Sequence, residues 1–521
     1  MSIDEAFTEC LTQVSEYVSN VDASVVDNIP EALLLFVRQS GVDPNFRETY
    51  AQLEQTWTSL ADIYARGQAV LADPHAEGIH RTLNGAIMLG RNLVSVAKAG
   101  TFAWDSGAST QVISIIQTLL ELKDQSSGAT KTFNTSLQFL ANLSNQASNT
   151  PAIITKIFDG VLTGTPAATL DKLLTRLEPS AAAPLLLIID SCLRHSSVNG
   201  LKFYESDNGQ TIFRWILNLT PVWYDLSNDI FINFVSLIIH HILEFGYASQ
   251  FLTQAIESEA YEPAQVLSLL KLFDAGLADI SSFEFAARKD LFDPIYTLFE
   301  ETSKKAVPHM IQAKDNDDLS EDESAPIFHT WNLLIILLDF LEALLSDRIA
   351  DASQGTNEAI VQYAITQKPI VKALVDIFHV AQVHLPKANK LGEYVQAQTS
   401  EATESHTAQH TKFPLVKGRI ITLLGILTMG NRTVQDEIRE RQGLELVLSN
   451  CIIDIHNPFI KERAIICLRY LLENNAENQA FVAKLEAKST VTEEALDEAG
   501  LETEIIDGKI ALKKKARVEE V

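Results

Sequence analysis

Histidine pairs are the first residues of this chain whose type and spacing could hold a metal. His240 and His241 are adjacent in an apolar segment of helical pattern, so their side chains point to different faces. His406 and His410 have the i, i+4 spacing of a helical metal site, but they lie in a polar stretch without a cysteine or a third ligand nearby. Because a zinc site needs three or four convergent ligands, the sequence predicts no metal site.

A serine followed by acidic residues offers a second kind of chemistry. Ser320 precedes Glu321, Asp322 and Glu323, the pattern that an acid-directed kinase prefers. A hydroxyl in a charged, exposed segment is accessible to such an enzyme, so Ser320 is a candidate phosphorylation site. The alternative is an unmodified, solvated acidic loop.

Basic and thiol side chains give weaker signals. The run Lys513-Lys514-Lys515-Ala516-Arg517 has the composition of a nuclear localisation signal, but a solvated basic end that offsets the acidic tail explains it equally. Four cysteines, at positions 10, 192, 451 and 467, form no Cys-x-x-Cys pair. So few cysteines make no disulfide framework, and their apolar surroundings predict structural thiols.

Motifs for nucleotide binding and nucleophilic catalysis are absent from the sequence. The chain has no Gly-x-Gly-x-x-Gly, no Gly-x-x-x-x-Gly-Lys-Ser/Thr and no Gly-x-Ser-x-Gly. Its carboxylates are too numerous to nominate a catalytic pair. The sequence therefore predicts a protein that is not an enzyme and that holds no cofactor.

Charge and composition narrow the classes of partner. The 521 residues include 68 acidic and 41 basic side chains, a formal net charge of −27. This charge repels nucleic acid and anionic lipid, and it weakly favours basic or neutral partners. Hydrophobic residues make up 46% of the chain, enough for an extensive core. We expect other proteins as partners and no nucleic acid, and a homo-oligomer is among the assemblies left open.

The sequence shows no targeting or membrane-spanning segment. Its N-terminus, Met1-Ser2-Ile3-Asp4-Glu5, lacks the basic and apolar regions of a signal peptide. The longest apolar runs, 184–189 and 333–338, each end at an aspartate and are much shorter than the roughly 20 residues that span a bilayer. We expect a reduced, cytoplasmic setting without membrane insertion.

Helical spacing of apolar residues dominates the chain. Between 46 and 72, large apolar residues step by three or four positions from Phe46 and Tyr50 through Trp57 to Tyr64, as on one face of a single helix. No sustained alternation with hairpin turns predicts strands. Further helices are expected at 31–38, 79–98, 152–158, 166–177, 183–195, 210–219, 229–245, 250–258, 263–275, 327–346 and 359–384.

Two segments near the C-terminus repeat each other. Leu424 corresponds to Leu468, and Asn431 corresponds to Asn475. In both segments an apolar helical stripe runs into a turn centred on asparagine, and a new helix follows. A strandless repeat of about 40–47 residues is the period of armadillo and HEAT repeats. We therefore expect an all-α, right-handed armadillo/HEAT-like α-solenoid of roughly eight to ten units.

Asparagines are also paired in the N-terminal part. Asn92 and Asn142 are each followed by leucine and occupy equivalent places in two helical units. A side-chain amide can bond a carbonyl and an N–H at once. We therefore expect each asparagine to bridge successive repeats.

Two polar stretches interrupt the helical pattern. Residues 313–326 hold six acidic side chains among the nine from Asp315 to Glu323, which predicts a solvated, disordered loop. Residues 386–411 are rich in Gln, Thr, Ser, Glu and His and predict a disordered loop or linker. We expect armadillo-like repeats with these two insertions over 1–411, and a C-terminal domain over 412–515 whose repeats reach about 488 before a tail.

One run of residues points to a known family. Asn457-Pro458-Phe459-Ile460-Lys461-Glu462, with Glu477-Asn478-Gln479 downstream, resembles the C-terminal domain of the ataxin-10 family, over residues 412 to about 515. Gly90-Arg91-Asn92-Leu93 and residues 137–142 resemble that family's armadillo part more thinly. Arg463 and Tyr470 stand where the family often has Trp and Asn. The two long polar insertions fit a fungal member.

The signature residues Asn457, Pro458, Phe459, Glu462, Asn478 and Gln479 predict structural roles. Asn457 is expected to cap a helix that begins with Pro458, whose missing N–H costs nothing there. That helix has the amphipathic offsets that bury one face. The buried residues of this face are expected to be Ile460, Ala464, Cys467, Leu468, Leu471 and Leu472.

The resemblance implies a cytoplasmic armadillo-repeat protein with no known catalytic activity, associated with cytokinesis, cell division and the scaffolding of signalling proteins. We accordingly expect a non-enzymatic scaffold or adaptor whose concave groove binds another protein. The alternative is an armadillo-type nuclear transport carrier, with 513–517 as an internal mimic of cargo. A recurring ladder of Trp and Asn would mark such a carrier, and only Trp331-Asn332 and Trp215 with Asn218 approach it.

Overall fold

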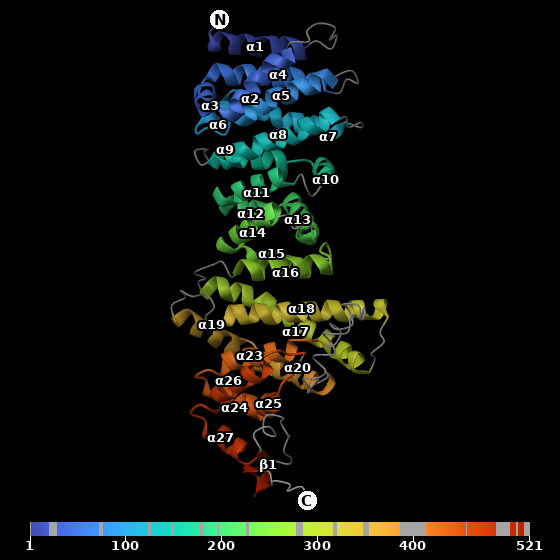
Figure 1. Ribbon diagram of the computed structural model, residues 1–521, viewed down its shortest axis with the longest axis vertical. Coiled ribbons are helices and arrows are strands. Elements are labelled where there is room, and N and C mark those ends of the chain that lie inside the picture. Colours follow the sequence, from blue (N-terminus) through green and yellow to red (C-terminus); the bar gives the residue numbers. More distant parts are fainter. Residues whose placement is uncertain are drawn as a thin grey trace, which may run out of the picture. The chain divides into compact units, whose positions relative to one another are not determined.

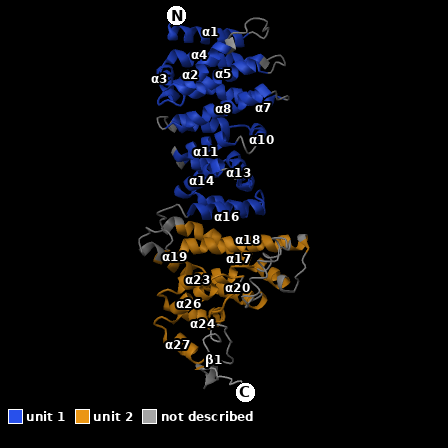
Figure 2. Cartoon of the chain, in the orientation of Figure 1, with its two compact units in different colours: residues 1–281 blue, residues 282–521 orange. Residues whose placement is uncertain are grey.

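The computed structural model describes most of the chain. The described residues are 2–19, 29–71, 77–122, 127–146, 151–177, 182–195, 197–225, 229–277, 285–315, 320–346, 354–385, 413–454, 456–485, 501–506 and 509–514. The chain forms two compact units, residues 1–281 (unit 1) and 282–521 (unit 2), shown in Figure 2. The division at 411/412 drawn from the sequence stays a prediction, and the expected linker 386–411 lies outside the described residues.

Unit 1 consists of stacked helices (Figure 1). Short helices alternate with pairs of longer ones, which is the build of an armadillo repeat. The elements are α1 (Ile3–Val18), α2 (Ile29–Val42), α3 (Pro44–Ala51), α4 (Glu54–Val70), α5 (Glu77–Leu93), α6 (Ala99–Asp105), α7 (Ala108–Glu121), α8 (Ser127–Asn145), α9 (Pro151–Phe158), the π-helical turn η1 (Asp159–Thr163), α10 (Ala167–Arg176), α11 (Ala183–His195), α12 (Ser197–Glu205), α13 (Asp207–Asp225), α14 (Asp229–Glu244), α15 (Ala248–Glu257) and α16 (Pro263–Leu277).

The longer helices of unit 1 form two rows. One row packs α1, α4, α7, α10, α13 and α16 in that order, and the other packs α2, α5, α8, α11 and α14. We call the second row the ladder row. The core lies between the rows, where Trp57, Phe139 and Ile189 are fully buried. The ladder row therefore has one face toward this core and presents the rest of its surface outward.

The stretch 46–72 is two helices rather than one. α3 ends at Ala51 and α4 begins at Glu54, with Leu53 in extended backbone between them. The indole Nε1 of Trp57 donates to the backbone oxygen of Ala51 at 2.8 Å and so satisfies the end of α3. The prediction of a single helix is wrong, because the bond from Trp57 stabilises a helix end at Ala51. The sequence gives no sign of this end, since neither Gly nor Pro stands there.

Unit 2 continues in helices and ends in a hairpin. Its helices are α17 (Phe285–Asp315), α18 (Glu321–Leu345), α19 (Gln354–Gln367), α20 (Ile370–His384), α23 (Val416–Thr428), α24 (Arg432–Glu440), α25 (Gly443–Leu448), α26 (Ile460–Leu472) and α27 (Ala476–Ala483). α18, α23 and α26 pack side by side in that order, and α17 packs on α20. Within the described residues up to 485, both units have the all-α, armadillo/HEAT-like build predicted for residues 1 to about 488.

The tail contains two strands that the sequence did not predict. β1 (Leu501–Ile506) and β2 (Lys509–Lys514) form an antiparallel pair in which Ile505 lies opposite Ile510. Aspartate and glycine at 507 and 508 separate the strands, and Asp-Gly is a strong hairpin signal. The expectation of no hairpin is therefore wrong for this segment. Of the basic run 513–517, only Lys513 and Lys514 are described.

The acidic stretch 313–326 is largely helical. α17 extends to Asp315 and α18 starts at Glu321, so only 316–319 lie outside the described residues. The carboxylate of Glu323 accepts from the backbone N–H of Ser320 at 3.1 Å and from its hydroxyl at 2.6 Å. The disordered-loop prediction is wrong for these helical residues, because acidic side chains favour the positive N-terminus of a helix as readily as they favour solvent.

α18 is apolar enough to raise the question of membrane insertion. Its segment Asp322–Leu345 has a mean hydropathy of 1.6 over the most apolar window, and half of that window is buried inside the protein. The guanidinium of Arg419 in α23 pairs with Asp339 at 2.7 Å and with Glu342 at 3.5 Å. These contacts are those of a core helix within unit 2, so the segment is weak grounds for a membrane span.

Candidate functional site

Side-chain amides connect neighbouring helices of the ladder row. Asn92 in α5 donates through Nδ2 to the backbone oxygen of Val37 at 3.3 Å and to the hydroxyl of Ser40 at 3.0 Å, both in α2. Asn142 in α8 donates to the backbone oxygen of Arg91 in α5 at 3.2 Å. The prediction that these two asparagines bridge successive repeats is confirmed.

Arginines extend these contacts along the row. Nη1 of Arg91 donates to Oε1 of Gln138 in α8 at 2.6 Å. Partial burial lowers the pKa of Arg91, although a guanidinium keeps its charge at neutral pH. In α11, Arg194 donates to Oδ1 of Asn145 at 3.2 Å and pairs with Asp190 at 2.6 Å. Polar contacts thus link α2, α5, α8 and α11.

His241 carries the same line of contacts to α14. Its Nε2 lies 3.2 Å from Oδ1 of Asp190, and both side chains are buried. His240 is half-buried and lies 3.8 Å from Glu244. Across the described ranges, no group of three His, Cys, Asp or Glu side chains could hold a metal ion, and residues 406 and 410 fall outside those ranges.

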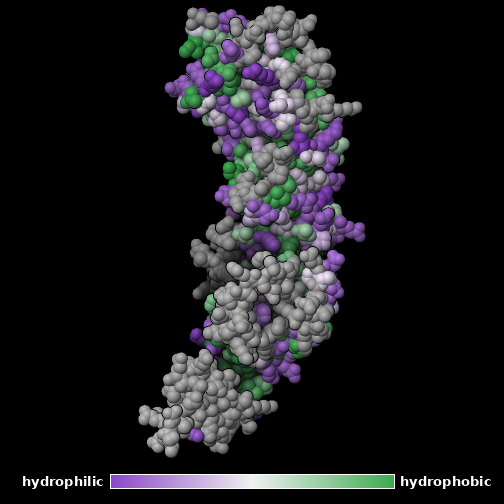
Figure 3. All heavy atoms as spheres, turned by 45° about the vertical axis from the view of Figure 1, so that its right-hand side comes forward, coloured by the Kyte–Doolittle hydropathy of each residue, from purple (hydrophilic) through white to green (hydrophobic). Residues whose placement is uncertain are grey.

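A hollow of about 600 Å³ opens between α2, α5 and α8 of the ladder row. No sequence signal indicates it, because its walls come from three helices that are distant in the chain. Figure 3 shows that the described surface of unit 1 is mostly hydrophilic on the face drawn, with small hydrophobic patches. The hollow is lined by Leu33, Leu34, Val37, Gly78, His80, Arg81, Thr82, Asn84, Gly85, Met88, Ser127, Gly128 and Lys131.

A smaller hollow of about 200 Å³ lies between α17 and α20 in unit 2. Lys304, Lys372 and Asp376 line it beside apolar residues. Lys372 forms an ion pair with Asp376. The charge of this lysine is therefore balanced within the hollow.

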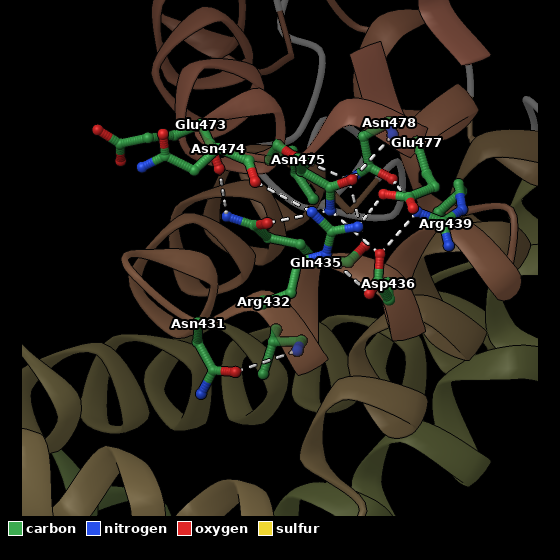
Figure 4. A network of polar contacts seen from close by, with 12 residues as sticks. Asn431, Arg432, Gln435, Asp436, Arg439, Glu473, Asn474, Asn475, Glu477 and Asn478 are labelled. Atoms are coloured by element: carbon green, nitrogen blue, oxygen red, sulfur yellow. Dashed lines mark hydrogen bonds and ion pairs between the residues drawn. The ribbon is translucent and has the colours of Figure 1, made fainter. Parts of the chain in front are cut away.

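The two matching segments of unit 2 end in the same way. Oδ1 of Asn431 accepts from the N–H of Val434 at 3.2 Å and caps α24. Oδ1 of Asn475 accepts from the N–H of Asn478 at 2.9 Å and caps α27. Figure 4 shows both asparagines. The predicted polar turn followed by a new helix is confirmed in both segments.

The turn before α27 is bound to α24 by amides (Figure 4). Nδ2 of Asn475 donates to Oε1 of Gln435 at 3.0 Å and to Oδ1 of Asp436 at 3.1 Å. Nε2 of Gln435 donates in turn to the backbone oxygens of Tyr470 at 2.8 Å and Glu473 at 3.2 Å. These bonds fix the last repeat against the one before it.

Two arginines add charge to this network. Arg432 pairs with Asp436 at 2.9 Å and also with Glu477, and Arg439 pairs with Asp436 at 2.7 Å. Burial alone would raise the pKa of Asp436, but hydrogen bonds from Arg432, Arg439 and Asn475 hold it below its ordinary value. Every charge here has a partner, so the network stabilises the fold and is not a reactive centre.

Asn457 has a different role from the predicted one. α26 begins after Phe459, which has a φ of 62°, and not at Pro458. The buried Asn457 accepts through Oδ1 from the N–H of Gly418 at 3.2 Å and donates through Nδ2 to Asp454 at 3.0 Å. The capping prediction is wrong because this side chain holds its loop against the start of α23.

The remaining signature residues divide between interior and surface. Asn478 is fully buried, and its Nδ2 donates to the backbone oxygen of Leu471 at 2.7 Å. The other signature residues are exposed. They are Pro458, Phe459, Glu462 and Gln479.

α26 buries less of its apolar surface than the sequence predicted. Of the expected face, Ile460, Ala464, Cys467 and Leu471 are buried, while Leu468 and Leu472 are half-buried. Phe459 is 72% exposed, and Ile465 and Ile466 are each 53% exposed. We call these three exposed residues the α26 surface.

Ser320 is exposed at the start of α18. Its hydroxyl donates to Glu323, and these bonds lower the pKa of that carboxyl. The geometry leaves the serine accessible, and its modification stays a prediction.

The four cysteine thiols are buried or half-buried. Burial raises the pKa of Cys10 to about 11 and that of Cys467 to about 12. Burial also raises the pKa of Cys192 and of the half-buried Cys451. Thiols held protonated in this way have the structural character that the sequence predicted.

Known proteins resemble the chain most closely at its C-terminal end. Residues 416–513 match a family model described as the spinocerebellar ataxia type 10 protein domain. An ataxin-10 homolog from Debaryomyces hansenii is 29% identical over 441 residues, which are 83% of this chain and 80% of that protein. An ataxin-10 homolog from Candida albicans is 55% identical over 104 residues, 20% of this chain and 22% of that protein.

Solved structures also match the chain, at low TM-scores. A designed armadillo repeat protein covers 64% of this chain and 99% of its own, with 12% sequence identity and a TM-score of 0.28. A structure from a study of cadherin and beta-catenin covers 88% of this chain and 99% of its own, with 11% identity and a TM-score of 0.32. At scores this low the solved structures add nothing to the helix packing described above.

Proposed function

Because the chain belongs to the ataxin-10 family, we propose that it acts in cell division, in cytokinesis or its signalling, as a non-enzymatic scaffold that binds other proteins. The fold and the family are those of a protein-binding scaffold. We propose that the protein acts as a scaffold in the cytoplasm. The assignment to cell division rests on the family resemblance alone.

The single observation that carries the binding proposal is the ladder row. Five helices from different repeats lie side by side and are joined by side-chain bonds such as those of Asn92 and Asn142. Bonds of this kind hold neighbouring helices of the row together. Rigid repeat surfaces are the usual binding surfaces of solenoid proteins, since a partner finds contacts on several repeats at once.

The nuclear-carrier alternative finds less support. Such a carrier would need tryptophans beside the asparagines of the ladder row, and α5, α8, α11 and α14 contain none. Trp57 and Trp223 are buried in the opposite row, in α4 and α13. Asn92 and Asn142 are present in the row without the tryptophans that a carrier would add, so we favour the scaffold.

Self-association is a second kind of binding that we propose for unit 2. The α26 surface exposes a phenylalanine and two isoleucines, and aromatic residues with apolar neighbours are frequent contact residues at protein interfaces. Light scattering of the full chain beside a variant with Ile465→Lys and Ile466→Lys tests this proposal. A lower mass for the variant supports self-association, and a monomeric mass for both contradicts it.

Affinity purification from native cells tests the proposed function. Tagged wild-type protein is compared, by mass spectrometry, with a version that lacks 412–521. Recovery of cell-division or signalling proteins with both versions supports the proposal, because the truncation leaves the ladder row in place. Recovery of transport factors with diverse basic cargo would favour the carrier instead.

A further inference from the structure

The hollow of the ladder row has an apolar side. Leu33 and Val37 of α2 are buried, while Leu34 is 41% exposed, and Met88 of α5 belongs to the same lining. Gly85 brings the two helices close, because a Cβ at this position would lie 3.0 Å from Cδ2 of Leu33. The hollow can therefore take an apolar side chain of modest size.

The lining of the hollow also carries unbalanced positive charge. Arg81 of α5 and Lys131 of α8 are both exposed, and neither forms an ion pair with any described residue. The lining also includes Gly78, Ser127 and Gly128 at the starts of the same two helices. The positive ends of two helix dipoles thus belong to the same lining as the two cations.

This local charge is opposite in sign to that of the whole chain. The sequences of α2, α5 and α8 together contain two acidic residues, Glu31 and Glu77, and four Lys or Arg residues, although the chain as a whole carries a net charge of −27. Unpaired cations grouped in an acidic protein increase the attraction for an anionic ligand at that place. The rest of the protein keeps its negative net charge, which repels nucleic acid.

An unused hydrogen-bond acceptor lies in the same lining. Oδ1 of Asn84 is buried and has no hydrogen-bond partner among the described residues. The amide Nδ2 of the same residue makes only a weak contact of 3.8 Å with the sulfur of Met88. A buried acceptor without a donor costs free energy, and a turn of the Asn84 side chain toward the hollow would let the N–H of an extended peptide supply the missing bond.

We propose that this hollow binds an acidic, extended segment of a partner protein. One carboxylate of the segment lies between Arg81 and Lys131, a neighbouring apolar side chain contacts Leu34 and Met88, and a backbone N–H of the segment donates to Asn84. The inference deepens the proposed scaffold function and rests on it. It also departs from the partner that net charge alone favours, because the charge that a ligand meets is local.

Peptide titrations of the full chain test the proposal. Short fluorescent peptides that alternate Asp with Leu are compared, by anisotropy, with peptides that alternate Asn with Leu and Lys with Leu. The Asp peptide is expected to bind, and the isosteric Asn peptide is expected to bind at least about tenfold more weakly. Equal binding of the Asp and Asn peptides would overturn the assignment of a carboxylate site.

Charge reversal locates the binding. The double variant Arg81→Glu/Lys131→Glu is expected to bind the Asp peptide at least about tenfold more weakly than wild type. The matched control Lys271→Glu/Lys461→Glu changes net charge equally at exposed positions of α16 and α26 and is expected to bind normally. Equal losses in both variants would show that only net charge matters and would overturn the site.

Two further outcomes separate this inference from the scaffold function. If native partners still co-purify with Arg81→Glu/Lys131→Glu as well as with wild type, the scaffold function stands and the hollow is not its acidic docking site. If a phosphoserine peptide binds while the Asp peptide does not, the carboxylate assignment is wrong. Melting curves of both double variants check that each remains folded.

Discussion

The ammonium of Lys417 lies 2.8 Å from Oδ2 of Asp454, and the two side chains are 1% and 2% exposed. Asp454 also accepts from Nδ2 of Asn457 and from the N–H of His456, both at 3.0 Å. The pair joins the start of α23 to the loop before α26. These bonds hold the loop that contains Asn457, although this loop has no regular secondary structure.

Removing one partner of this pair should destabilise unit 2 strongly. Asp454→Ala leaves the buried ammonium of Lys417 without a counter-charge, and we expect a loss of about 3–5 kcal/mol in the free energy of unfolding. Urea unfolding measures it. The double variant Lys417→Met/Asp454→Leu removes both charges and should lose less than the single variant. A double variant as unstable as Asp454→Ala would show that the ion pair is not the main contribution.

The two capping asparagines should differ in their contributions to stability. Asn431→Ala removes a helix cap, which costs about 1 kcal/mol. Asn475→Ala also removes bonds to Gln435 and Asp436 in a fully buried position, and we expect a loss of about 2 kcal/mol or more. Thermal and urea unfolding of the two variants gives the comparison. Equal losses would contradict the role assigned to the network of Figure 4.

The cysteines should react in an order set by burial. Cys451 is half-buried, while Cys10, Cys192 and Cys467 are buried. Under native conditions we expect a thiol reagent to label Cys451 first, and the other three only after unfolding. Peptide mapping after timed labelling measures the order. Rapid native labelling of Cys467 would contradict the described packing of α26.

The same thiols predict a dependence of stability on alkaline pH. Burial raises the pKa of Cys10 from 9.0 to about 11 and that of Cys467 to about 12. The folded state therefore retains these protons longer than the unfolded state. Their contribution to stability is complete below pH 9 and is lost as the pH rises through 11 to 12. The urea midpoint should fall above pH 9, and less steeply in Cys467→Ala.

Ser320 should accept phosphate from an acid-directed kinase. The serine is exposed, and three acidic residues follow it. A phosphate there would lie at the N-terminus of α18, where the helix dipole favours negative charge. We expect phosphopeptide mapping to find one modified site in this segment, lost in Ser320→Ala. Unchanged incorporation in that variant would exclude Ser320, and Ser346→Ala serves as the control.

Features that depend on a repeating local pattern could be predicted from the sequence. The caps at Asn431 and Asn475 follow from an apolar stripe that ends in asparagine, and the bridges of Asn92 and Asn142 follow from their equivalent places in two repeats. Each depends on neighbours within a turn or on the next repeat. These neighbours can be identified from the spacing of the repeats in the sequence.

Features that depend on a distant partner could not be predicted in the same way. Asn457 has a local sequence suited to a cap, but its bond to the N–H of Gly418 decides its role. The break between α3 and α4 depends on the indole of Trp57, and the hollow depends on three helices at once. Acidic residues after Ser320 fit both a loop and a helix start, so composition alone could not separate the two.

The most direct test of the account is cross-linking of the full chain to the proteins that co-purify with it, read by mass spectrometry. The ladder row is the proposed binding surface, and Lys131 in α8 and Lys271 in α16 are exposed lysines on opposite rows of unit 1. If partners bind the ladder row, their peptides cross-link to Lys131 and rarely to Lys271. Partner cross-links at Lys271 with none at Lys131, or no co-purifying protein at all, would contradict it.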